Sequence, residues 1–164
     1  MARSSTIPPA PSPAVSAAMA REARALVERS LAAAMATHTA AGTPFATLVE
    51  YATESSGAPL LCLSDLAEHT KNLAYGTRIS LLVVDAEGNG PSLARSRVTL
   101  VGTLSRAEDD PALKETFVTR LPHARSYVDL GGFHMYRLAV EEVRLVQGFG
   151  RMGWVSGGDY ATSD

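Results

Sequence analysis

The alternation of apolar and polar positions predicts one helix near the start of the chain, followed mainly by strands. Four short segments rich in β-branched and other apolar residues predict strands at 45–51, 60–63, 79–84 and 97–104. Before them, a spacing of three or four indicates an amphipathic helix with a stripe of Ala23, Leu26, Val27, Ser30, Leu31, Ala34 and Met35.

Turn and capping residues divide the later part of the chain. The Ser- and Gly-containing turn at 55–57 predicts that the strands on either side of it pair as a hairpin. Asp110-Pro111 is typical of a helix start, and Pro122 predicts where that helix ends. A last β region is expected over 133–146, with a break near Glu141-Glu142. The helix predicted between Pro111 and Pro122 has an apolar stripe of Leu113, Phe117 and Leu121.

This order of elements predicts a mainly β fold with flanking helices. Short strands joined by tight turns favour antiparallel pairing, and the helices are too few to cover both faces of a parallel sheet. We therefore expect a small β-barrel domain over residues 16–156. Four prolines among small and polar residues predict a disordered leader over 1–15, and the loose composition of 157–164 predicts a flexible tail.

Composition narrows the classes of partner. Of the 164 residues, 46% are hydrophobic and 20% are charged, and the formal net charge is −2, so no overall field attracts nucleic acid or anionic lipid. No segment resembles a membrane span or a signal peptide, so we expect a cytoplasmic protein that binds neither membrane nor nucleic acid. The single cysteine, Cys62, excludes an intrachain disulfide, and its apolar neighbours predict a small buried side chain.

Residues 64–72 are the best candidate for a binding segment. A strand ends there and a short helix begins, and Asp65 and Glu68 have the spacing of a capping box. Free backbone N–H groups at a helix start favour an anion, so a phosphate is a plausible ligand. The alternative is a capped helix whose polar side chains face water. The side-chain donors in this segment are Ser64, His69, Thr70, Lys71 and Asn72.

Two arginines add to the anion hypothesis, while other motifs are missing. Arg95 and Arg97 share one face of a predicted strand by period-two alternation, and a guanidinium suits a phosphate dianion. The alternative is again a pair of solvated charges at a strand edge. The four histidines lack the spacing of a zinc site, and we find no dinucleotide-binding, phosphate-loop or hydrolase motif. We therefore predict no metal site and assign no catalytic residue.

Several segments resemble the FMN-binding split-barrel family related to pyridoxamine 5'-phosphate oxidase, in its haem-utilisation (HugZ-like) branch. The most specific is Ser-Asp-Leu-Ala-Glu-His-Thr-Lys-Asn-Leu at 64–73. The segments at 44–52, 94–102, 127–133 and 148–151 add support. The resemblance implies a Greek-key split β-barrel that forms a homodimer, with FMN held at the subunit interface.

The resemblance also implies which residues approach the cofactor. The first hairpin of the family lines the flavin ring, which carries to Ala46, Thr47, Leu48 and Val49. The strand end and short helix hold the phosphate and ribityl chain, which carries to Ser64 and the residues at 69–72. The long strand contributes Arg97, from the same or the partner subunit, and the C-terminal region contributes Trp154.

Departures from the family pattern leave alternatives open. Thr47 and His69-Thr70 stand where the oxidases have basic residues, so we do not expect pyridoxamine 5'-phosphate oxidase activity. The main expectation is an FMN-dependent oxidoreductase with a small redox substrate. The alternatives are a haem-binding or haem-degrading protein that uses the same dimer, with His123 or His134 as a conceivable ligand, and a reductase that binds F420.

Overall fold

The computed structural model describes residues 13–107, 110–148 and 150–163. Its elements are, in chain order, α1 (Pro13–Arg29), β1 (Ala32–His38), β2 (Pro44–Glu50), β3 (Ala52–Thr53), β4 (Pro59–Ser64), α2 (Glu68–Asn72), β5 (Arg78–Val84), η1 (Ser92–Ala94), β6 (Ser96–Arg106), α3 (Pro111–Arg120), η2 (Pro122–Ser126), β7 (Phe133–Gln147), β8 (Arg151–Ser156) and α4 (Gly157–Ala161). The predicted leader lies outside the described residues, except for its last three, which belong to α1. None of the described helices has the length and apolar character needed to cross a membrane.

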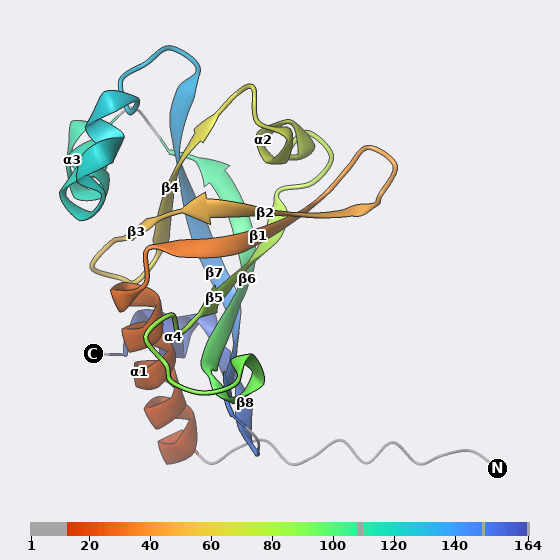
Figure 1. Ribbon diagram of the computed structural model, residues 1–164, viewed down its shortest axis with the longest axis vertical. Coiled ribbons are helices and arrows are strands. Elements are labelled where there is room, and N and C mark those ends of the chain that lie inside the picture. Colours follow the sequence, from red (N-terminus) through yellow and green to blue (C-terminus); the bar gives the residue numbers. More distant parts are fainter. Residues whose placement is uncertain (1–12, 108–109, 149, 164) are drawn as a thin grey trace.

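The strands form one antiparallel, strongly curved sheet, as Figure 1 shows. Hydrogen bonding connects them in the order β2-β1-β5-β6-β7-β4-β3, and β8 adds to β7. Only Tyr51 separates β2 from β3, although these two strands lie at opposite ends of the path. The sheet must therefore curl until its ends approach each other, which gives the barrel-like form expected from the sequence.

The first predicted helix is too long. Helix α1 ends at Arg29, and residues 32–38 form strand β1 instead of the last helical turns. In β1 the residues that face the core are Ala33, Met35 and Thr37, which alternate with more exposed neighbours. Small alanine side chains are compatible with both the helical and the strand periodicity. Here the segment forms a strand, because it pairs with β2 on one side and β5 on the other.

The predicted hairpin between 45–51 and 60–63 is only partly right. Strand β2 pairs with β1, and the turn at 55–57 joins β4 to the two-residue strand β3. The predicted helix over 111–121 is confirmed, because the Asp110 carboxylate accepts a hydrogen bond from the Ala112 N–H and the helix ends before Pro122. Its stripe of Leu113, Phe117 and Leu121 is buried.

The expected break near Glu141 is a β-bulge within one continuous strand. Across β6 and β7, Val101 pairs with Glu142 whereas Gly102 pairs with Val140, so Glu141 is the extra residue. At this point the two backbones come so close that a Cβ on Gly102 would lie 2.0 Å from the Ala139 carbonyl oxygen. The bulge therefore requires glycine at position 102.

Two apolar clusters stabilise the fold. The main cluster fills the barrel beneath α1 and includes Leu26, Tyr51, Leu100 and Leu138. A smaller cluster lies beneath α3 and η2, centred on Phe117. Figure 1 shows α3 at one side of the upper end of the sheet and α1 along its lower end.

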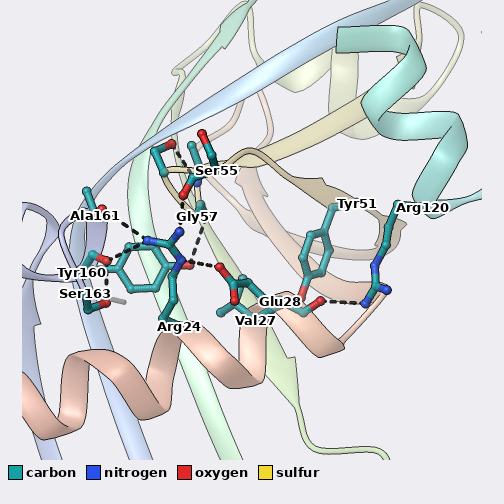
Figure 2. Close-up of polar contacts among 12 residues, drawn as sticks. Arg24, Val27, Glu28, Tyr51, Ser55, Gly57, Arg120, Tyr160, Ala161 and Ser163 are labelled. Carbon is teal, nitrogen blue, oxygen red and sulfur yellow. Dashed lines mark hydrogen bonds and ion pairs between the residues drawn. The ribbon is translucent and has the colours of Figure 1, made fainter. Parts of the chain in front are cut away.

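The C-terminal segment is not a flexible tail. Residues 157–161 form α4, and Tyr160 is only 1% exposed. Figure 2 shows the Arg24 guanidinium next to Tyr160, with hydrogen bonds to the backbone carbonyls of Ser55, Tyr160 and Ala161. The composition that suggested a loose end gave no sign of a contact with a residue more than 130 positions earlier.

We call this group the Arg24 anchor. Arg24, on α1, also forms an ion pair with Glu28 at 2.5 Å, and its guanidinium carbon lies 5.9 Å from the centre of the Tyr160 ring. The Tyr160 hydroxyl donates to the Gly57 carbonyl at 3.0 Å. Gly57 has φ +77°, and a Cβ there would lie 2.6 Å from Arg24 Nε. The anchor thus joins α1, the β3–β4 turn and α4 through one buried cation.

Candidate functional site

A pocket of about 290 Å³ lies where the two apolar clusters meet. Val49 and Leu63 belong to the main cluster on one side of it, and Phe117 belongs to the smaller cluster on the other. We call it the seam pocket. The residues that line it are Leu48, Val49, Glu50, Cys62, Leu63, Ser64, Ala67, His69, Phe117, Tyr127 and Phe133.

Four of the predicted site residues line the seam pocket. Leu48 and Val49 come from β2, Ser64 comes from the end of β4, and His69 comes from α2. Two further predicted residues, Ala46 and Thr47, lie on β2 but do not line the pocket. Because α2 packs against β1 and β2, segments that are far apart in the sequence meet here.

The remaining predicted residues of α2 have different surroundings. Asn72 is 1% exposed and donates its side-chain amide to Thr37 Oγ1 at 3.0 Å, so it fastens α2 to β1. Lys71 is exposed and lies 3.9 Å from Glu68. The Thr70 hydroxyl is buried and has no hydrogen-bond partner among the described residues.

The predicted capping box does not form. The residue at the N-cap of α2 is Ala67, and no side chain caps the helix. Ser64 Oγ instead accepts a hydrogen bond from the Leu66 N–H at 3.2 Å, and Asp65 contacts His134 at 3.0 Å. With five residues, α2 is also too short for a substantial dipole. The anion site at this helix start stays a prediction.

Arg97 and Trp154 lie far from the seam pocket within one chain. Ser64 pairs with Phe133 at the start of β7, whereas Arg97 pairs with Val146 near its end. Thirteen residues along a strand correspond to roughly 40 Å. Arg97 donates to the Leu93 carbonyl at 3.2 Å, and Trp154 lies on β8 with the Arg144 guanidinium 5.4 Å from its ring centre.

One face of the sheet carries apolar side chains that the described residues leave uncovered. Directly paired residues run across six strands in a single row: Leu48, Ala34, Leu82, Thr99, Arg144 and Trp154. A second row contains Val84, Arg97, Val146 and Met152. Directly opposite residues share a face, and here Leu48 is 74% exposed and Trp154 is 54% exposed. We call this surface the outer face.

Sequence reasoning missed the aromatic wall of the seam pocket. The rings of Tyr127 and Phe133 lie 5.2 Å apart, and the ring of His123, which does not itself line the pocket, lies 6.4 Å from that of Tyr127. Phe117 completes this wall from α3. The helical stripe identified Phe117 as a core residue, but the pairing of β4 with β7 that brings Phe133 beside Ser64 has no local signal in the sequence.

Burial favours the uncharged form of three groups that line the pocket, whose other titratable residue is Glu50. It raises the pKa of the Cys62 thiol to about 11 and also raises the pKa of the Tyr127 phenol. Burial lowers the pKa of the His69 imidazole below 6.5. At neutral pH the pocket therefore presents a thiol, a phenol and a neutral imidazole, and Cys62 is half-buried, close to what its apolar neighbours predict.

Comparison with known proteins identifies the family. The family model described as "CREG, beta-barrel" matches residues 14–162. The chain belongs to the CREG β-barrel family. A solved structure described as a haem-binding protein from Mycobacterium smegmatis is 38% identical, with a TM-score of 0.82 over 87% of this chain and 60% of that one.

Two curated relatives of this CREG β-barrel protein are named for haem. The chloroplastic non-canonical haem oxygenase HOZ of Arabidopsis thaliana is 33% identical over 65% of the chain, and the match spans only a third of the plant protein. The haem oxygenase HutZ of Vibrio cholerae is 28% identical, over 76% of the chain and 74% of HutZ.

The fold is shared more widely. A Clostridium acetobutylicum structure from the pyridoxinephosphate oxidase family has a TM-score of 0.65 at 17% identity, over 85% of this chain and 95% of that one. The predicted split-barrel family and its haem-utilisation branch are thus confirmed. The relatives named here by ligand are named for haem, which supports the haem alternative and not the main expectation of FMN.

Proposed function

We propose that this protein binds haem between the seam pocket of one protomer and the outer face of a second copy. The observation that carries the proposal is the pocket itself. Its wall is aromatic and aliphatic, and it contains His69, an imidazole without a hydrogen-bond partner among the described residues. A flat apolar macrocycle with a metal centre suits such a lining, whereas a phosphate dianion does not. The haem names of the relatives support the same ligand.

The size of the pocket supports a site shared between two copies. A volume of about 290 Å³ is at the lower limit for sites that enclose drug-sized ligands, and a macrocycle is larger. A second surface must therefore cover the rest of the ligand. Leu48 lies on the outer face and also lines the pocket, so the two surfaces are continuous.

A symmetric dimer through the outer face would complete this site. In a two-fold interface each copy uses the same surface, and with the axis perpendicular to the rows the two ends of each row exchange places. The Trp154 end of one copy then meets the Leu48 end of its partner. This arrangement uses the predicted homodimer and would give Arg97 and Trp154 a role beside a pocket that they cannot reach within one chain.

The residues of this chain have distinct tasks in such a site. Phe133 and Tyr127 would pack against the ring, and Leu48 would exclude water from its edge. The guanidinium groups of the partner's Arg97 and the partner's Arg144 would bind the two propionates, since their donors match a carboxylate. When bound, haem supplies an iron that can react with dioxygen, and the two relatives named as haem oxygenases support oxidative haem degradation as a second candidate function.

Parallel titrations of the purified protein with haem and with FMN test the proposal. We expect haem to give a saturable Soret band with one equivalent per protomer, and FMN to give no saturable change in its absorption. Reaction of the haem complex with ascorbate in air, followed by loss of the Soret band, tests degradation separately. A protein that purifies with bound FMN or F420 and gives no haem saturation would show that the proposal is wrong.

A further inference from the structure

Haem iron needs an axial ligand, and two of the four histidines have partners that hold their rings. His134 Nε2 lies 3.0 Å from the Asp65 carboxylate, and its Nδ1 lies 2.6 Å from the Arg106 guanidinium. His123 Nε2 lies 2.8 Å from Glu50. Both ring nitrogens of His134 are therefore engaged within the protomer, and His123 does not line the seam pocket, although these were the histidines first considered for haem.

The other two histidines differ in their surroundings. His38 is exposed at the end of β1, opposite Pro44, and does not line the seam pocket. His69 is half-buried, lines the pocket and has no hydrogen bond to any described residue. The His69 ring nitrogens are therefore available to a ligand in the pocket.

Two other side chains of the pocket could in principle ligate iron, and both are disfavoured. A thiolate or a phenolate is the form that binds a metal. Burial raises the pKa of Cys62 to about 11 and raises that of Tyr127, so both stay protonated at neutral pH. A neutral imidazole, by contrast, is already the form that coordinates iron.

We propose that His69 supplies the axial nitrogen to haem iron, an inference that rests on the proposed haem function. His69 lies on α2, and the hydrogen bond from the Asn72 amide to Thr37 holds this helix against β1. The position of the His69 ring is therefore restrained. Asn72 then acts as a positioning residue.

Cavity rescue by imidazole tests the assignment. We expect His69→Gly to shift the Soret band of the haem complex and to raise the haem Kd at least tenfold, and we expect added imidazole to restore the spectrum of the natural protein. His69→Met keeps the side-chain volume and should give a different spectrum, characteristic of a thioether, which covers the case in which the glycine variant folds poorly. His123→Gln and His134→Gln are the matched controls and should leave the spectrum unchanged.

The outcomes separate the two proposals. If the natural protein binds haem and neither His69 variant changes the spectrum, the ligand assignment is wrong while haem binding stands. If only His134→Gln changes the spectrum, the assignment of His69 as the ligand is likewise wrong, while haem binding stands. If the natural protein binds no haem, both the proposed function and the ligand assignment fail.

Discussion

The Arg24 anchor and the seam pocket lie in different parts of one small barrel. They differ in whether their polar side chains have hydrogen-bond partners. In the anchor, a cation that is 7% exposed has three backbone carbonyls, a carboxylate and an aromatic ring around it. In and beside the pocket, His69 and the buried Thr70 hydroxyl have no partner among the described residues. Complete pairing stabilises the fold, and incomplete pairing leaves groups for a ligand.

The largest effect should follow from removing the anchor. Arg24→Ala leaves Glu28 and several carbonyls without their donor, so we expect the free energy of unfolding to fall by about 3–5 kcal/mol. Thermal and urea unfolding measure the change. Arg21→Ala, an exposed position on the same helix, is the control and should shift stability by less than about 0.5 kcal/mol. Equal losses in the two variants would contradict the anchor.

Disruption of the outer face, the proposed dimer interface, should affect association and not folding. Leu82→Glu places a charge at the centre of the outer face, and we expect the dimer Kd to rise about 100-fold, or ~2.7 kcal/mol. Light scattering across a dilution series measures this, and haem affinity should fall in parallel. Leu31→Glu, at an exposed position between α1 and β1, is the control. A dimer that persists unchanged in Leu82→Glu would exclude this face as the interface.

Reactivity of Cys62 reports on the pocket lining. Since burial raises the pKa of Cys62 from its ordinary value of 9.0 to about 11, the thiolate fraction at pH 8 is about 100-fold lower than in the unfolded chain. Alkylation by iodoacetamide should be slower by that factor in the folded protein and should accelerate as pH rises through 9 and 10. The same chain in urea provides the reference. Equal rates in both states would mean that the thiol is not held in an apolar site.

The smallest effect should come from a single hydroxyl of the anchor. Tyr160→Phe removes the bond to the Gly57 carbonyl while it keeps the ring beneath Arg24, so we expect a loss of about 1 kcal/mol. The matched control is Tyr75→Phe, because Tyr75 is well exposed. Chemical unfolding of both variants measures the contribution of the Tyr160 hydroxyl apart from that of its ring. A loss of stability as large as that of Arg24→Ala would contradict the view that Arg24 contributes most to the anchor.

Local patterns in the sequence predicted much of the fold and little of the site. Strands β5 and β6 and the helix capped by Asp110 follow from residues that are neighbours in the chain. Strand β1 was missed because its alanines also fit a helix, and α4 because its contacts with Arg24 come from the other end of the chain. The predicted segment at 64–72 contributes Ser64 and His69 to the pocket. The aromatic wall depends on the register between β4 and β7, which local sequence patterns do not predict.

Hydrogen–deuterium exchange with and without haem tests the central claim most directly. If haem lies between the seam pocket and the outer face of the partner, its addition should slow exchange in residues 48–50, 62–69 and 151–156. Exchange in α1 and α4, which the anchor already protects, should not change. Protection confined to α1 and α4, or no protection in the presence of saturating haem, would contradict the claim.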